Sequence, residues 1–403
     1  LSHSAETLEW LEEMGLRFHG PSPEPPNRVP RMHNVIPGAR AYIGALQDRL
    51  QTCGGRVVCD ADVVQILRDK QGVTGVVALI DGHEQNLLAR RGVVMAAGDY
   101  TNSADLISRF KGERFSGVEG INPRSTGHGH TLCEQAGAQL LNMDITYGPE
   151  LRFVAPEGRG SLQKMIPSRG PLASLVGKLV PLVPDRLMAR FVRRLLVTWQ
   201  HPEDALLEDG AILLNEDGER FCDERLSPER EIAIAAQPGK RCFLLLDEAL
   251  ISRYSAWPHF ISTAPRIAYA YVDDYLRLRP DVAVAGRLEE VTDRRGLPSA
   301  AVRAVIDAVN VERGDVGVLP HLAGKRWALL GPAKAYFTTT EGGVAIDQEF
   351  RALDVAGDPI RGLYAIGQNG LGGQILWGHG LHIAWAMTSG RLVGRQLAQD
   401  ACA

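Results

Sequence analysis

An unbroken apolar run that ends in glycine occurs twice in this chain, and this pattern constrains the fold more than any other. The first run is Gly92-Val-Val-Met-Ala-Ala-Gly98, and the second is Gly362-Leu-Tyr-Ala-Ile-Gly367. Strands covered on both faces of a parallel sheet are continuously apolar rather than alternating. Ligands of such sheets bind beyond the carboxyl ends of the strands, where glycine lets them approach the backbone. The pattern predicts two buried parallel strands that end at a ligand site.

The segments around these runs predict helices and short strands. Ser4 can cap a helix whose residues Leu8, Leu11 and Met14 share one face. Asp81-Gly82 is a favoured hairpin turn between two strands. The remaining expected elements are helices over residues 40–53 and 379–397 and strands over residues 56–59, 63–67, 73–80 and 85–89.

Charge and cysteine content exclude several classes of protein. A net charge of −4 over 403 residues provides no basic field for nucleic acid. The six cysteines form no Cys-x-x-Cys pair, which argues against a zinc knuckle or a disulfide framework and favours a reducing cytoplasm. No apolar run reaches the roughly 18 residues of a membrane span. The chain begins with Leu1 inside a helical pattern, so we expect upstream sequence to be missing.

The C-terminal block combines a strand end, glycines and a helix start. Leu363-Tyr-Ala-Ile-Gly-Gln-Asn-Gly370 is followed by Gly372-Gly373 and then by Trp377-Gly-His-Gly-Leu-His-Ile-Ala384. The first N–H groups of a helix lack an intrahelical partner, and the helix dipole favours negative charge beside them. This arrangement predicts a site for an anion or a carbonyl group. The alternative is a tightly packed glycine turn that binds nothing.

Four further blocks occur in order along the chain. They are Gly92 to Gly98, Thr126-Gly-His-Gly with Glu134-Gln-Ala-Gly-Ala138, Leu213-Leu-Asn-Glu-Asp-Gly-Glu-Arg-Phe-Cys-Asp-Glu224, and Thr340-Glu-Gly-Gly343. Together with the C-terminal block, they resemble the fumarate reductase and 3-ketosteroid dehydrogenase flavoproteins over nearly the whole chain. The resemblance implies an α/β fold, in which a Rossmann-like FAD-binding domain, incomplete at its N-terminus, carries an inserted α+β capping domain. We expect residues 1–121 and 331–403 to form the FAD-binding domain and residues 122–330 to form the cap.

The resemblance also implies which residues hold FAD. Ala97 and Gly98 would line the cofactor, and Gly367 and Gln368 would meet its ribityl chain, with Gln368 replacing the usual Glu or Asn. The backbone of Val63 or Val64 would meet the adenine. The residues expected to present N–H groups to the flavin ring are Gly380, Leu381, His382 and Ile383. A reduced flavin is negatively charged at this edge, so such donors would raise its electron affinity.

Several family positions differ in this chain. The family's pyrophosphate-binding loop Gly-x-Gly-x-x-Gly does not occur in this sequence. We expect that loop to lie upstream of Leu1. Pro228, Thr339 and Trp377 stand where fumarate reductases have a proton-delivering arginine, a histidine and a substrate-clamping arginine. Arg225 and Arg230 are displaced candidates for the proton-delivering arginine. A dicarboxylate needs such charge-assisted contacts, so the substrate is not expected to be one. Leu376 replaces the catalytic tyrosine of ketosteroid 1-dehydrogenases.

The groups expected to move protons are Tyr336, His379 and Arg230. His379 and His382 are one helical turn apart near the helix start, and an imidazole can transfer protons near neutral pH. Each histidine could instead be bonded to backbone or packed on FAD. No metal site is expected, because this pair has no third ligand at a recognisable spacing. His128 and His130 form another pair, in a block whose role the resemblance implies is structural.

Residues 172–199 suggest a different role. Leu187, Phe191 and Leu195 lie on one helical face, and arginines such as Arg190 and Arg194 occupy the rest. A basic amphipathic helix of this kind can lie on an anionic membrane. The alternative is a cap helix buried against the main domain or a second subunit.

The sequence as a whole predicts an FAD-dependent oxidoreductase acting on CH–CH groups. Hydride exchange at a carbon next to a carbonyl would saturate or desaturate a small organic or steroid-like substrate. The electron acceptor is unknown, no nucleic-acid partner is expected, and the location is cytoplasmic with a peripheral membrane contact as an option. The alternative is an inactive or truncated remnant that only binds a ligand or a membrane.

Overall fold

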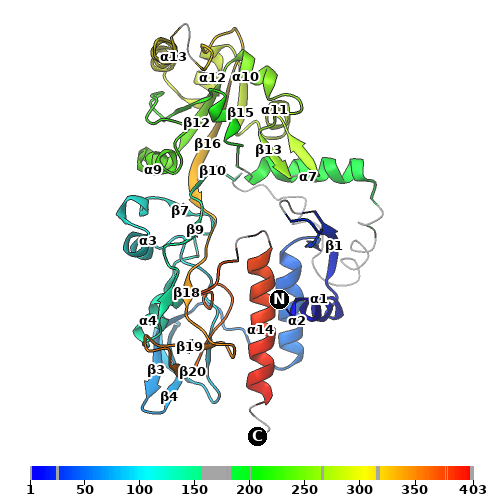
Figure 1. Cartoon of the computed structure of the whole chain (residues 1–403), viewed down its shortest axis with the longest axis vertical. Coiled ribbons are helices and arrows are strands. Elements are labelled where there is room, and N and C mark those ends of the chain that lie inside the picture. Colours follow the sequence, from blue (N-terminus) through cyan, green and yellow to red (C-terminus); the bar gives the residue numbers. More distant parts are fainter. Residues whose placement is uncertain are drawn as a thin grey trace.

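The computed structural model describes residues 2–23, 27–155, 179, 183–199, 201–264, 267–314, 318–376, 378 and 380–399. Figure 1 shows an elongated molecule with a helix-covered sheet at one end and smaller sheets beside long helices at the other. The 11-residue strand β16 (Trp327–Phe337) runs from the first part towards the second.

The part nearest the chain ends contains two small sheets that share a core. One is a mixed sheet in the order β19-β20-β6, and the other is the antiparallel meander β3-β4-β5. Ile66 and Val73 of the meander pack with Met95 and Leu363 of the mixed sheet. The strand bounds are β3 Ala61–Asp69, β4 Gly72–Ile80, β5 His83–Leu88, β6 Val93–Met95, β19 Arg351–Leu353 and β20 Pro359–Ala365.

The opposite end is built on a six-stranded sheet. Its path is β10-β16-β12-β11, and β15 and β7 also pair with β16. The strands are β7 Glu119–Gly120, β10 Glu150–Phe153, β11 Ile212–Leu214, β12 Cys242–Leu246, β15 Ala283–Gly286 and β16. All five residues of β12 are buried, which places this strand in the main hydrophobic core.

Helices surround both parts (Figure 1). Those of the six-stranded end are α7 Asp185–Trp199, α8 Ala205–Glu208, α9 Glu229–Ala236, α10 Glu248–Arg253, α11 Val272–Leu278, α12 Leu288–Arg295 and α13 Ser299–Arg313. The others are α1 Ser4–Glu13, α2 Arg40–Thr52, α3 Ala104–Phe110, α4 His128–Gln135 and α14 Leu381–Gln399. Leu11 of α1 and Tyr42 of α2 form a small core with Met387 of α14.

Four two-stranded pairs complete the described structure. They are β1 Arg17–Ser22 with β2 Met32–Ile36, β8 Leu140–Leu141 with β18 Gly343–Val344, β9 Thr146–Tyr147 with β17 Thr339–Thr340, and β13 Ser262–Ala264 with β14 Ala268–Ala270. Two of these pairs, β8 with β18 and β9 with β17, join segments far apart in the sequence.

The structure confirms that the two glycine-ended apolar runs form neighbouring parallel strands. The expected burial holds for Leu363 to Ala365 but not for the first run, in which only Met95 is buried and Ala96 and Ala97 are exposed. Leu363, Tyr364 and Ala365 of β20 align with Val93, Val94 and Met95 of β6. The predicted hairpin turn is also confirmed, because Asp81 and Gly82 both have positive φ values, 52° and 76°, as a type I′ turn requires. The expected domain boundaries at 121/122 and 330/331 stay predictions.

The strand expected over residues 56–59 is wrong. These residues form no strand, and Val57 and Val58 are 56% and 53% exposed. A strand exists only where a neighbouring strand accepts and donates its backbone hydrogen bonds, and the described residues provide none here. The β-propensity of residues 56–59 was therefore not enough to predict a strand.

Helix α7 packs its C-terminal half against the six-stranded end, which lies within the residues expected to form the cap and is called the cap below. Leu196 and Val197 are buried in the main core, and Arg193 Nε lies 3.7 Å from Asp274 Oδ2. Leu187 and Phe191 remain 52% and 39% exposed. Residues 172–178 lie outside the described residues, so the membrane contact stays a prediction. No helix of the described chain combines the length and apolar character that crossing a bilayer requires.

Candidate functional site

The carboxyl ends of β6 and β20 meet as the two apolar runs predicted. The side chain of Asn369, just beyond β20, accepts a hydrogen bond from the backbone N–H of Ala97, just beyond β6, at 2.6 Å. Ala97 is exposed, although it follows the buried Met95 by only two residues. The chain therefore emerges from the core at the strand end and presents its backbone at an open surface.

Two predicted site glycines provide open backbone. Gly98 and Gly380 have φ values of +81° and +78°, and a Cβ at either position would meet no described atom within 4 Å. Positive φ is costly for other residues, and the missing side chain leaves space for a ligand. Gly367 is different, because a Cβ there would already touch Ala386 Cβ at 3.5 Å.

The side chain of Gln368 is held by hydrogen bonds to residues at the neighbouring strand ends. Its amide Nε2 donates to Asp99 Oδ2 at 3.2 Å and to the hydroxyl of Thr339. These contacts link the segments after β6 and β20 to β17. The side chain that replaces the family's Glu or Asn is thereby oriented by neutral and acidic acceptors.

The start of α14 lies next to this surface. The N–H of Leu381 donates to Gly378 at 3.2 Å and that of Ala384 donates to Gly380 at 2.9 Å. The N–H groups of His382 and Ile383 have no acceptor within the described chain, as expected for the first turn of a helix. Ile383 is 46% exposed. The first turn therefore offers backbone donors to an electron-rich group.

The side chain of His382 has a partner that the sequence did not reveal. Its Nε2 lies 3.1 Å from Oε1 of Glu341, which belongs to the Thr340-Glu-Gly-Gly343 block. Glu341 is fully buried, and its second oxygen accepts from the N–H of Leu376 at 2.9 Å. This carboxylate thus lies between the helix start and the segment before it, bonded to Leu376 and at ion-pair distance from the imidazole.

Val64 occupies a β-bulge. Val63 aligns with Ala78 and Gln65 aligns with Val77, so Val64 has no partner in the register of β3 and β4. A bulge residue keeps its backbone groups out of the ladder, where a ligand can use them. Nε2 of His128, at the start of α4, lies 2.6 Å from the carbonyl oxygen of Val63. This contact supports the bulge from the side of α4.

His130 is a core residue. It is fully buried with its ring edge-on to Tyr100 at 5.0 Å, and burial lowers the pKa of His130 to about 4, opposed by the backbone of Gln368. It is therefore neutral at physiological pH. In the part of the chain that the structure describes, no three His, Cys, Asp or Glu side chains are placed to hold a metal ion.

Tyr336 lies half-buried near the end of β16, three residues before Thr339. It is opposite Glu150 of β10 and beside Glu119 of β7 in the sheet register. Burial, and then the charge of Glu119, raise the pKa of Tyr336 above its ordinary value. The phenol therefore remains protonated at neutral pH and can donate but not abstract a proton.

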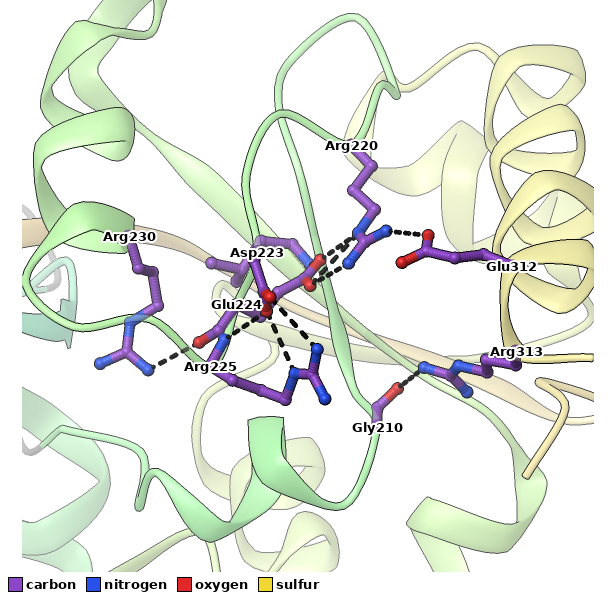
Figure 2. A network of polar contacts seen from close by, with 9 residues as sticks. Gly210, Arg220, Asp223, Glu224, Arg225, Arg230, Glu312 and Arg313 are labelled. Carbon is purple, nitrogen blue, oxygen red and sulfur yellow. Dashed lines mark hydrogen bonds and ion pairs between the residues drawn. The ribbon is translucent and has the colours of Figure 1, made fainter. Parts of the chain in front are cut away.

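The structure places Arg230 in the interior of the cap. Only 4% of it is exposed, and its guanidinium donates to Glu231 at 2.7 Å, Asp204 at 2.8 Å and the carbonyl of Glu224 at 3.0 Å. Figure 2 shows it at the edge of a polar network within the cap. None of these partners is a residue of the strand-end site. Its catalytic role stays a prediction, and His379 lies outside the described residues.

The residues present fit FAD. The side-chain Nδ2 of Asn369 is buried without a hydrogen-bond partner among the described residues, so it needs an acceptor. FAD offers phosphate, ribityl and ring carbonyl oxygens. Open backbone at Gly98, Gly380 and Val64 and the donors at the start of α14 supply further contacts of the kind expected. The individual assignments of these residues to FAD stay predictions.

Comparison with known proteins identifies relatives of the same kind. A family profile described as "FAD binding domain" matches residues 1–153 and 185–375. The chain is 25% identical over 93% of its length to NADH:acrylate oxidoreductase of Vibrio harveyi, and 24% identical over 99% to vinyl phenol reductase of Lactiplantibacillus plantarum. It spans 34% of the first relative's length and 79% of the second's.

Solved structures share the fold. An open conformation of a flavocytochrome c3 fumarate reductase superposes with a TM-score of 0.66 at 20% identity, covering 99% of this chain and 63% of that one. The 3-ketosteroid-Δ4-(5α)-dehydrogenase of Rhodococcus jostii RHA1 gives 0.51 at 21% identity, covering 98% and 78%. The resemblance to fumarate reductases and ketosteroid dehydrogenases is confirmed, and the fold is a mixed α/β FAD-binding fold.

Proposed function

The chain belongs to the FAD binding domain family, and from this we propose that it is an FAD-dependent oxidoreductase. Bound FAD would exchange a hydride with a substrate carbon next to a carbonyl or similar group, so that a C–C bond is saturated or desaturated. The observation that carries the proposal is the convergence of three elements, namely the exposed end of β6, the adjoining end of β20 and the first turn of α14.

The substrate we propose is a small organic or steroid-like molecule that is not a dicarboxylate. Thr339, which stands in place of a family histidine, is engaged with Gln368 rather than available to a carboxylate. Pro228 and Trp377 replace two arginines that a dicarboxylate would need. Relatives named for acrylate and vinyl phenol support a substrate with one activated double bond.

His382 and Glu341 form the group that we propose holds a proton at the site. Because Nε2 faces the buried Glu341 carboxylate, Nδ1 is the ring atom left to exchange a proton with substrate or water. Glu341 acts as a positioning residue, since its other oxygen is bonded to Leu376 N–H. The pair lies at the helix start, beside the proposed flavin position.

Tyr336 is the proton donor that we propose on the cap side. Its raised pKa keeps the hydroxyl protonated through the neutral range. A protonated phenol can deliver a proton to the carbon next to the one that receives the hydride. Arg230 is a weaker candidate, because its guanidinium is occupied by Glu231 and Asp204.

The test is flavin binding followed by reoxidation. The purified protein is titrated with FAD by fluorescence, reduced without oxygen, and mixed with 4-vinylphenol, acrylate, androstenedione or fumarate. We expect FAD to bind and at least one of the first three compounds, but not fumarate, to restore the oxidised flavin spectrum. Failure of the natural full-length protein to bind FAD overturns the proposal. Binding without reoxidation by any compound favours the ligand-binding alternative, and rapid reoxidation by fumarate alone overturns the substrate class.

A further inference from the structure

A cavity of about 260 Å³ lies in the cap, away from the strand-end site. Its walls come from the turn between α8 and β11, from the segment around Glu224 and from the C-terminal half of α13. Apolar side chains at Leu207, Ala211 and Val309 line one part, and three arginines line another. Drug-sized ligands occupy about 300–1,000 Å³, so this cavity suits a smaller molecule.

Two of the three arginines are neutralised by carboxylates (Figure 2). Arg220 donates to Glu224 at 2.8 and 2.9 Å and to Glu312 at 2.7 Å. Arg225 makes a two-point contact with Asp223 at 3.1 and 3.2 Å. These two guanidinium groups therefore have little remaining need for an anion.

Arg313, the third arginine of the cavity, bonds to backbone carbonyls instead of carboxylates. Its NH1 donates to the carbonyl of Pro320 and its NH2 to that of Gly210, both at 2.7 Å. A guanidinium has five N–H donors, so two bonds leave donors for the cavity. No carboxylate is among its hydrogen-bond partners in the described chain. Burial accordingly lowers the pKa of Arg313, with Glu224 opposing the shift.

Gly210 makes this placement of Arg313 feasible. It has a φ of +111°, and a Cβ there would lie 3.2 Å from NH2 and 3.3 Å from NH1 of Arg313. Any larger residue would push the guanidinium away from the backbone. The local chain thus holds a guanidinium against one wall of the cavity that hydrogen-bonds no carboxylate of the described residues, although Glu224, Asp247 and Glu312 lie near enough to act on its charge.

We propose that this cavity binds a small monocarboxylate, with its carboxylate on Arg313 and its apolar body against Leu207, Ala211 and Val309. A planar guanidinium matches a carboxylate better than any other anionic group of this size except phosphate. Arg220 and Arg225 already bond to carboxylates, so Arg313 is the guanidinium with donors left for one ligand carboxylate. The three arginines and the carboxylates of Asp223, Glu224 and Glu312 balance in charge, which disfavours a ligand with two negative charges. A second carboxylate on the ligand would approach Glu224 and Glu312 and be repelled. The site is independent of the proposed flavin chemistry.

The competing explanation is that Arg313 only stabilises the C-terminus of α13, where a cation is favoured by the helix dipole. In that case removing its charge would lower stability without changing any ligand affinity. The test must therefore measure binding as well as folding.

The probe is benzoate, titrated calorimetrically into the full chain, with benzyl alcohol as the uncharged analogue and succinate as the dicarboxylate. Arg313→Met removes the charge but keeps the aliphatic stem. Val309→Phe fills the cavity and leaves Arg313 in place. Arg303→Met is the matched control, because Arg303 is an exposed residue of the same helix whose partner is Glu289. Circular dichroism confirms that each variant is folded.

We expect benzoate to bind the wild-type chain more tightly than either analogue. Its affinity should fall about tenfold or more in Arg313→Met, since a charge-assisted hydrogen bond is lost, and in Val309→Phe, and stay unchanged in Arg303→Met. If Arg313→Met does not fold, Val309→Phe decides alone. Absence of binding, equal affinity in both variants and the wild type, or tighter binding of succinate would each overturn the proposal.

Discussion

Replacing Arg230 by methionine should strongly destabilise the cap. Arg230 and Glu231 are 4% and 0% exposed, and the guanidinium is bonded to Glu231 and to Asp204. Removing one partner of a buried ion pair leaves an uncompensated buried charge, which costs about 3–5 kcal/mol. We expect Arg230→Met to lower the free energy of unfolding of the cap by this amount at neutral pH, measured by urea denaturation with circular dichroism.

The loss of stability caused by Arg230→Met should also depend on pH, in a direction set by the pKa of Glu231. Burial raises the pKa of Glu231, and Arg230 opposes that rise. Without Arg230 the pKa should rise further, so Glu231 becomes protonated in the folded state at a higher pH than in the unfolded chain. A group whose folded pKa is raised binds a proton preferentially when folded, and stability then increases as pH falls through the folded pKa. The penalty of Arg230→Met should therefore be smaller at acidic pH than at pH 8.

Two variants provide controls. Arg225→Met removes an exposed partner of Asp223 and should cost only about 0–1 kcal/mol. Replacing both Arg230 and Glu231 by methionine should recover much of the loss, because neither charge remains buried. If Arg230→Met costs no more than Arg225→Met, or if its penalty is independent of pH, the reasoning from buried charge is refuted.

Three further outcomes follow from the site and the cap. Tyr336→Phe should lower kcat by about 10²–10⁴ with little change in FAD affinity, and an unchanged kcat would remove Tyr336 as the proton donor. Gly98→Val should weaken FAD binding in a fluorescence titration, because φ is +81° and the added side chain would occupy the open space; equal affinity would place FAD elsewhere. The Arg190→Glu and Arg194→Glu double variant should pellet less with anionic vesicles than the wild type, and equal pelleting would contradict the membrane contact.

The sequence predicted the local elements of the site well, since each depends on short-range patterns. Continuous apolar runs identified β6 and β20, and the Asp81-Gly82 pair identified the hairpin turn. It was less informative about the cap. The fully buried strand β12 was not predicted, although its run of Cys242 to Leu246 is apolar throughout. An unbroken apolar run like those of β6 and β20 could have identified β12, but this run does not end in glycine.

Motif resemblance placed residues in order along the chain but not in space. Arg230 lies near the family position of a proton-delivering arginine, yet its charge is used inside the cap. Its neighbours Glu231 and Asp204 decide this, because a buried guanidinium must satisfy its donors wherever acceptors stand. A motif that records residue type and spacing cannot record those partners.

The sequence by itself indicated where β6 and β20 end, that a helix begins within two residues of position 381, and that Gly98 and Gly380 leave backbone open, since φ and ψ preferences act locally. Only the tertiary structure decided that Ala97 meets Asn369, that His382 faces Glu341 and that Arg313 donates to the carbonyl of Gly210. It also decided that residues 56–59 form no strand. Hydrogen bonds and buried charges join residues distant in sequence, so their partners exist only once the chain has folded.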